Sequence, residues 1–263
     1  MTEPIYNTGA IGYDEFFGQT TRLFIPALVE AAQLRDGQAV LDVATGTGVA
    51  AEAALAVVGP SGLVIGGDVS PNMLEVARKR LANLPVRLAH FDAHDLPFAD
   101  GSFDAVICQL GLMFFDDPER ALREFRRVLR MGGRAAVSVN STPESSLFLR
   151  VGAVIARHVP AKAEIFTRPF SIRDSARLHG LFDNAGFQKI NVSAESRDIG
   201  FASFDDYFSG IGNGATISGQ EYVILPEELR RRVREDVRRG LSLPRVDGAF
   251  SIEMKLLVGS GSA

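Results

Sequence analysis

Three aspartates follow three successive apolar runs of this 263-residue chain, and their spacing is the first sign of a binding site. Asp42 lies near the end of one predicted strand, Asp68 ends the next, and Asp92 comes directly after a third. A turn of small residues, Ala44-Thr45-Gly46-Thr47-Gly48, follows the first strand. Its glycines allow a ligand to approach the backbone closely, and the next helix begins with free N–H groups. Carboxylates only accept hydrogen bonds, so the set favours a ligand rich in donors and poor in phosphate.

Position along the chain suggests a role for each acid. Asp42 suits an ammonium group beside the turn, while the helix N-terminus suits a carboxylate. Asp68, twenty positions beyond Gly48, suits the two hydroxyls of a ribose. Asp92 suits an adenine amino group, and Met73, one helical turn after Asp68, suits the adenine face. An amino acid, a ribose and an adenine together describe S-adenosylmethionine.

Short β-branched runs alternate with amphipathic segments, a pattern typical of a mostly parallel sheet covered by helices. Because ligands of such sheets bind beyond the carboxyl ends of the strands, the three acids share one edge. The predicted strands of this half are 38–43, 63–68, 86–91, 103–110 and 135–140. Helices are predicted after Ser70 and over 118–130, the second ended by Gly132-Gly133.

The second half is predicted to add helices over 145–158, 173–184 and 226–239 and strands over 189–196 and 250–258. We interpret the chain as one domain, 1–263. Its parts are an N-terminal helical cap (1–37), a cofactor-binding core (38–140), a variable substrate-side region (141–250) and a last strand (250–258).

Composition excludes several classes of protein. The net charge of −4 argues against a nucleic-acid binder that works by broad electrostatic attraction. The single cysteine, Cys108, allows neither an internal disulfide nor a multi-thiolate metal site, so no metal is expected. No apolar run is long enough to cross a bilayer and no signal peptide is visible, which predicts a cytoplasmic protein.

Four segments in this order resemble the class I S-adenosylmethionine-dependent methyltransferases. They are VLDVATGTG, GGDVSPNMLEVARKR, FDAHDLPFADGSFDAV and DDPERALREFRRVLRMGGR. The resemblance is specific over 38–140 and is greatest to the type 11 subgroup, which includes the ubiquinone- and menaquinone-biosynthesis C-methyltransferases. It implies an α/β, Rossmann-like sheet of seven strands, mostly parallel with a reversed last hairpin, flanked by helices and carrying a helical cap.

The resemblance also implies site residues. The family's methionine-binding loop falls on Asp42, Ala44, Thr45, Gly46, Thr47 and Gly48, where Ala44 replaces the first of the usual glycines. The ribose-binding acid falls on Asp68 with Val69 beside it, and the adenine contacts on Asp92, Ala93 and Met73. The position after the fourth strand falls on Gln109, and an N-terminal segment that folds over the cofactor carries Tyr13.

The implied reaction is methyl transfer to a small, largely apolar metabolite, a quinone precursor or a natural product, at carbon or oxygen. A phenolic acceptor needs a base, for which His158 and His179 are the candidates in the variable region. Two alternatives stay open: a protein that binds the cofactor without methylating, and an NAD-dependent oxidoreductase. The turn has no basic residue for a pyrophosphate and the chain has no Tyr-x-x-x-Lys, which disfavours the oxidoreductase. Lid candidates over an apolar pocket are Leu147, Phe148, Val151, Val154, Ile155 and Phe170.

Overall fold

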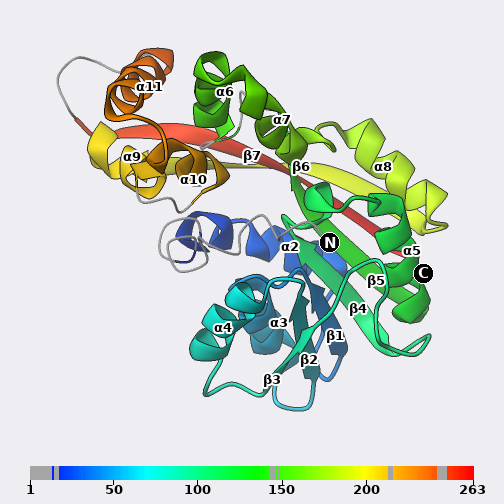
Figure 1. Ribbon diagram of the computed structural model, residues 1–263. Helices are drawn as coiled ribbons and strands as arrows, with labels where there is room; N and C mark the ends of the chain where they lie inside the picture. The colour runs from blue at the N-terminus through cyan, green and yellow to red at the C-terminus, as the bar shows by residue number, and fades with distance from the viewer. Residues whose placement is uncertain (1–13, 15–17, 143–145, 147–148, 213–215, 242–247) are drawn as a thin grey trace.

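A single seven-stranded sheet organises the chain (Figure 1). The computed structural model describes residues 14, 18–142, 146, 149–212, 216–241 and 248–263. The strand order is β3-β2-β1-β4-β5-β7-β6, with β1 to β5 parallel and β7 antiparallel to both of its neighbours. This confirms the predicted mostly parallel sheet with a reversed last hairpin. The strands are β1 Ala39–Val43, β2 Leu63–Asp68, β3 Val86–His90, β4 Phe103–Gln109, β5 Leu129–Asn140, β6 Gln188–Phe201 and β7 Phe250–Ser262.

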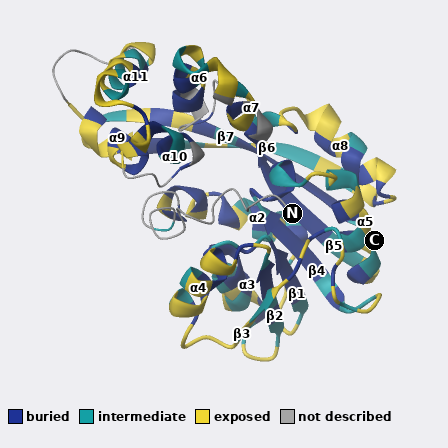
Figure 2. Cartoon of the chain, in the orientation of Figure 1, coloured by how far each residue is buried: buried dark blue, intermediate teal, exposed yellow. Residues whose placement is uncertain are grey.

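Alternate residues of the central strands enter two different apolar clusters, one on each face of the sheet. On β5, for example, Ala136 belongs to one cluster and Val137 to the other, as the period of two in a strand requires. Figure 2 shows the central strands mostly buried and the outer faces of the helices exposed. One face is covered by α2 (Ile25–Ala32), α3 (Val49–Val58) and α4 (Pro71–Arg80), the other by α5 (Pro118–Val128) and α8 (Ser175–Asn184).

The reversed hairpin extends past the carboxyl edge of the parallel strands. The last residue of β5, Asn140, pairs with Leu256 of β7, so residues 250–255 of β7 pair with β6 alone. At about 3.4 Å per residue this overhang is about 20 Å long. The chain between β6 and β7 adds α9 (Phe204–Gly212), α10 (Ile217–Val223) and α11 (Glu227–Gly240), which lie near α6 (Leu149–His158) at the end of the overhang (Figure 1).

Three details of the sequence prediction were wrong. The helix predicted over 118–130 ends at Val128, because Leu129 is extended and pairs with Phe103 of β4 before the two glycines are reached. The late strands are longer than 189–196 and 250–258. Residues 197–201 of β6 continue to pair with β7 beyond the end of β5, and residues 259–262 of β7 pair with both β5 and β6. The helices α9 and α10 were not predicted. No helix of the described ranges is long and apolar enough to cross a membrane.

Candidate functional site

The turn after β1 is held against the end of β2 by backbone and side-chain hydrogen bonds. Thr45 donates its N–H to the Gly67 carbonyl at 2.9 Å, and Gly46 donates its N–H to Oδ2 of Asp68 at 2.9 Å. The backbone of Gly46 has φ +55° and that of Gly48 φ +85°, both in the left-handed region that favours glycine. A Cβ at Gly46 would meet nothing within 4 Å, whereas one at Gly48 would lie 2.8 Å from Cδ1 of Leu81. Among the described residues, therefore, none lies against Gly46, whereas Gly48 faces packed protein.

Asp42 and Asp68 differ in how far their oxygens are used. Asp42 is fully buried; its Oδ2 accepts from the Thr45 hydroxyl at 2.6 Å, while Oδ1 has no hydrogen-bond partner among the described residues. Burial raises the pKa of Asp42 to about 7, opposed by the Thr45 hydrogen bond and reinforced by the Asp68 charge. Asp68 accepts from Gly46 through Oδ2 and from the Ser70 N–H through Oδ1 at 2.8 Å. Burial raises its pKa too, against these backbone hydrogen bonds.

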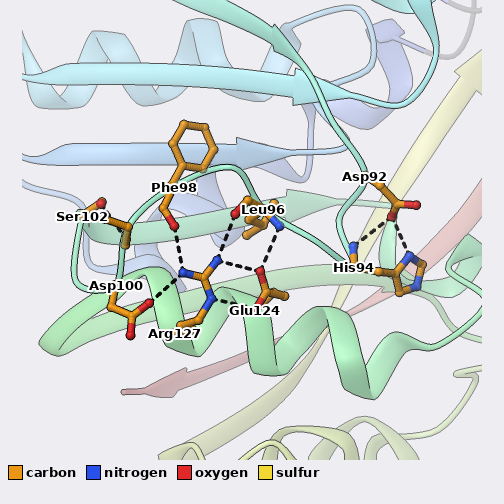
Figure 3. A network of polar contacts seen from close by, with 9 residues as sticks. Asp92, His94, Leu96, Phe98, Asp100, Ser102, Glu124 and Arg127 are labelled. Atoms are coloured by element: carbon orange, nitrogen blue, oxygen red, sulfur yellow. Dashed lines mark hydrogen bonds and ion pairs between the residues drawn. The ribbon is translucent and has the colours of Figure 1, made fainter.

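Asp92 follows β3, the neighbour of β2, and is exposed. Its Oδ1 accepts from the His94 N–H at 2.9 Å and lies 2.6 Å from His94 Nδ1 (Figure 3). His94 Nε2 accepts from the Asp117 N–H at 3.2 Å, which places the ring proton on Nδ1, directed at Asp92. Partial burial raises the pKa of Asp92, but the hydrogen bonds from His94 outweigh it and hold the pKa below its usual value. His94 thus fixes this carboxylate in its ionised form.

The loop that follows Asp92 is pinned to α5 by one arginine (Figure 3). Arg127 donates to the carbonyls of Leu96 and Phe98 at 2.9 and 2.8 Å and pairs with Glu124 and Asp100. Glu124 Oε2 in turn accepts the Leu96 N–H at 2.9 Å. The guanidinium fork suits two carbonyls and two carboxylates at once, which a lysine ammonium does less well. The network positions the segment that begins at Asp92.

The N-terminal segment reaches the same edge through contacts that the sequence did not suggest. Thr47 donates its hydroxyl to Oδ1 of Asp14 at 2.7 Å, and Arg80 of α4 binds both Asp14 and the Thr47 carbonyl. Gln109, at the end of β4, donates from Nε2 to the Thr21 carbonyl at 2.8 Å. Asp14 and Arg80 carry no pattern that marks them, since 66 positions separate them in the chain.

The other predicted contacts are placed as follows. Val69 is exposed beside Asp68, Ala93 is buried beside Asp92, and Met73 is buried in the first turn of α4, where its N–H donates to Ser70 Oγ at 3.3 Å. Tyr13 lies outside the described residues.

The two candidate bases are not brought to this edge together. His158, at the end of α6, has Nε2 2.9 Å from Oδ2 of Asp236 on α11. That hydrogen bond joins two helices and holds the pKa of Asp236 below its usual value. His179 is exposed on α8, which packs on α5, β6 and β7. The buried Cys108 has its pKa raised by burial, so it remains a thiol.

Ala44 occupies a backbone conformation that favours glycine, and Gly111 explains how its methyl group fits. Ala44 has φ +56°, and a Cβ added to Gly111 would lie 2.6 Å from Ala44 Cβ and 2.8 Å from Cys108 Sγ. The Ala44 methyl group therefore occupies the space that a side chain at position 111 would need.

We expect Gly111→Ala to lower the free energy of unfolding by about 1–3 kcal/mol, the usual cost of overpacking. Ala44→Gly removes one of the two contacts, so the double variant should recover part of this loss in urea unfolding. The matched control is Gly180→Ala on α8, where a Cβ meets no atom of the described residues within 4 Å and a helical alanine is favourable. A Gly111→Ala protein as stable as the wild type, or no recovery in the double variant, would contradict this packing account.

The site fits a ligand that donates hydrogen bonds. It offers the Oδ1 of Asp42 and the second lone pairs of the Asp68 oxygens, and no residue of the described ranges covers Gly46. Its one described cation at the turn, Arg80, is already paired with Asp14 and Glu52. Ammonium and ribose hydroxyl groups match this set, and a pyrophosphate does not.

Comparison with known proteins identifies the family of the chain. The family model described as a methyltransferase domain matches residues 41–137. The chain is 36% identical over 183 residues to the demethylmenaquinone methyltransferase of Staphylococcus aureus (strain JH9), covering 65% of this chain and 75% of that protein. The chain belongs to the S-adenosylmethionine-dependent methyltransferases. Its cofactor is S-adenosylmethionine.

Solved methyltransferase structures have the same fold as this chain. A predicted methyltransferase of Bacillus halodurans C-125 aligns with a TM-score of 0.60 at 23% identity, over 90% of this chain and 97% of that one. The phosphoethanolamine N-methyltransferase 2 of Haemonchus contortus, solved with S-adenosylhomocysteine, aligns with a TM-score of 0.61 at 18% identity, over 97% of this chain and 57% of that one. The two alignments support the Rossmann-like methyltransferase sheet.

Proposed function

We propose that this methyltransferase methylates a small, largely apolar metabolite of the quinone-precursor kind. The observation that carries the proposal is the set of apolar helices beyond the carboxyl edge of the sheet. Val151, Val154 and Ile155 of α6 are buried there, and α9 adds buried Tyr207, Phe208 and Ile211. Apolar walls with few polar groups are typical of sites for small apolar ligands. The name of the Staphylococcus aureus relative, a demethylmenaquinone methyltransferase, supports the same class of acceptor.

The three acids would hold the cofactor by its donors. Asp42 would face the ammonium group through its free Oδ1, Asp68 would accept the ribose hydroxyls, and Asp92, fixed by His94, would accept the adenine amino group. Ala44, Thr45, Gly46, Thr47 and Gly48 form the turn around the methionine part. Val69, Met73 and Ala93 would line the base, and Gln109, with Nε2 taken by Thr21, would offer its Oε1.

The protein's contribution to the reaction would be orientation and the exclusion of water. S-adenosylmethionine supplies an already activated methyl group, so the residues need only hold donor and acceptor in line. We assign no base: Nε2 of His158 is engaged with Asp236, and His179 is exposed on α8.

We propose that nucleic acid is not the acceptor. The arginine-rich helix α11 does not present a free positive stripe, because acidic side chains pair with four of its six arginines. The pairs are Arg231–Glu235, Arg232–Glu228, Arg234–Asp205 and Arg239–Asp236.

The test is methyl transfer from S-adenosylmethionine with a deuterated methyl group to a short-chain demethylmenaquinone, kept reduced to the quinol. Mass spectrometry should detect a product that has gained one labelled methyl group, and Asp68→Asn should form far less of it. Binding of S-adenosylhomocysteine without transfer to this acceptor would contradict the proposed substrate while leaving the cofactor site intact.

A further inference from the structure

A second unpartnered oxygen lies at the carboxyl edge, on Asn140. Asn140 is the last residue of β5 and only 4% exposed. Its Oδ1 is buried and has no hydrogen-bond partner among the described residues, a property it shares with Oδ1 of Asp42. A buried amide oxygen without a donor costs about 1–3 kcal/mol. Such a group in a folded protein calls for an explanation.

The contacts of the amide show which of its ends is free. Nδ2 of Asn140 donates to Sδ of Met113 at 3.9 Å, a weak contact to a weak acceptor. A carbonyl oxygen has no proton to give to a thioether, so the reverse orientation would make no hydrogen bond. Ser171 holds the Met113 segment in place by donating its hydroxyl to the Met113 carbonyl at 3.0 Å. The oxygen end of the amide is therefore the unpaired end.

The register of the sheet separates this oxygen from the cofactor acids. Asp42 pairs with Ile107 of β4, and Gln109 of β4 pairs with Ser138 of β5. Paired residues point to the same face of the sheet, and so do residues two positions apart in one strand. Asp42, Gln109 and Asn140 therefore share one face. Asn140 lies two strands across from Asp42 and four positions further along the strands. At about 4.8 Å per strand and 3.3 Å per residue, that is about 10 Å across and about 13 Å along. One ligand group cannot serve both oxygens.

We propose that Oδ1 of Asn140 accepts a hydrogen bond from a hydroxyl group of the methyl acceptor. This rests on the proposed function and narrows it to hydroxylated aromatics, phenols or hydroquinones, rather than their fully alkylated or oxidised forms. Asn140 lies on the β5 side of β4, opposite the side where Asp68 ends β2, and pairs with Leu256 of β7 at the point where the overhang begins. A site built to pair with a hydroxyl rejects the analogue that lacks it, because the buried oxygen then stays unpaired.

The test measures binding of two probes to the complex of the protein with S-adenosylhomocysteine. The probes are 1-naphthol, which has a hydroxyl donor, and 1-methoxynaphthalene, which has none. The wild type should bind 1-naphthol about tenfold more tightly, equivalent to about 1.4 kcal/mol. Asn140→Leu, of similar volume without polar atoms, should bind both equally. The matched control Asn184→Leu, on the exposed end of α8, should keep the preference.

Stability of the ligand-free protein gives a second readout. Because Asn140→Leu removes an unpaired polar atom, its midpoint of urea unfolding should equal or exceed that of the wild type, and its affinity for S-adenosylhomocysteine should not change. The proposal is overturned if Asn140→Leu keeps the preference or unfolds at lower urea. It is also overturned if the wild type shows no preference or binds neither probe. A wild type that fails to bind S-adenosylhomocysteine would instead contradict the cofactor assignment, which keeps the two failures distinct.

Discussion

Asp68→Ala is expected to weaken the binding of S-adenosylhomocysteine, the demethylated cofactor, by about 100-fold. Two hydrogen bonds from ribose hydroxyls to an ionised carboxylate contribute about 3 kcal/mol together, which corresponds to about 100-fold in affinity. Each Asp68 oxygen already accepts one backbone N–H, from Gly46 or Ser70, and keeps a lone pair for a ligand. Isothermal titration calorimetry measures the change, with NAD as the parallel ligand.

The same two backbone contacts mean that Asp68→Ala also loosens the turn. Asp68→Asn separates the loss of ligand contacts from the loosening of the turn, because it keeps the side-chain volume and one acceptor oxygen. It should lose one ribose hydrogen bond instead of two, which corresponds to about tenfold weaker binding of S-adenosylhomocysteine. Asp198→Ala, an exposed carboxylate on β6, is the control that should bind like the wild type. Unchanged affinity in Asp68→Ala, or tighter binding of NAD than of S-adenosylhomocysteine, would remove Asp68 from the cofactor site.

The proximity of the residues proposed to hold the cofactor could be predicted, because the sheet itself brings them together. Parallel strands end at one edge, so acids at or just beyond the ends of β1, β2 and β3 must be neighbours whatever the rest of the chain does. The turn from Ala44 to Gly48 is local, and its glycines mark the conformation it needs. Gly46 and Gly48 have positive φ in the structure.

The proposed acceptor half depends on contacts between segments far apart in the chain. The overhang arises because Ile199 pairs with Ile252 and Phe201 with Phe250 beyond the end of β5, across about fifty intervening residues. The ring centroids of Phe201 and Phe250 lie 5.6 Å apart; Phe201 belongs to the apolar cluster that includes residues of α9, and Phe250 packs against that cluster. No local pattern shows where such a pair of strands stops. The two glycines and two adjacent aspartates of α9 are poor helix formers and predict a loop. The burial of its aromatic residues, which stabilises the helix, depends on tertiary contacts.

Asn140 illustrates the same limit at the scale of one atom. In the sequence it only ends a predicted strand, as many asparagines do. Its free oxygen becomes visible when the register of β5 and the position of Met113 are both known. The surroundings of the two histidines could not be predicted either: His158 lies 2.9 Å from Asp236 of another helix, and His179 is exposed on α8.

Asp42→Asn is expected to stabilise the ligand-free protein at pH 8 and to weaken cofactor binding. The pKa of Asp42 is about 7 in the folded protein, against 3.8 for the ordinary group, because burial disfavours the charge. A raised acid pKa means that the folded state holds its proton between about pH 4 and 7 while the unfolded state releases it. Stability from this group is therefore complete below about pH 4 and is lost as the pH rises through 7. Three pKa units correspond to a loss of at most about 4 kcal/mol at pH 8.

Asparagine does not titrate, and it can still accept the Thr45 hydroxyl proton through its own oxygen. The difference in unfolding free energy between Asp42→Asn and the wild type should therefore grow from pH 4.5 to pH 8 in favour of the variant. Groups that titrate in both proteins cancel in this difference, apart from Asp68, whose pKa should fall once the neighbouring charge is gone. Asp183→Asn, an exposed carboxylate on α8, should show no such trend.

Cofactor binding should move in the opposite direction. In the ligand-free protein, the buried negative charge of Asp42 lowers the free energy of unfolding. An ammonium group bound beside Oδ1 would stabilise that charge, so cofactor binding would offset the loss. The affinity of the wild type for S-adenosylhomocysteine should rise from pH 6 to pH 8, and that of Asp42→Asn should stay flat and about tenfold weaker at pH 8. Calorimetric titration at both pH values measures this. A variant that gains stability at pH 8 but binds like the wild type would show that the buried charge serves the fold of the turn and not the ligand.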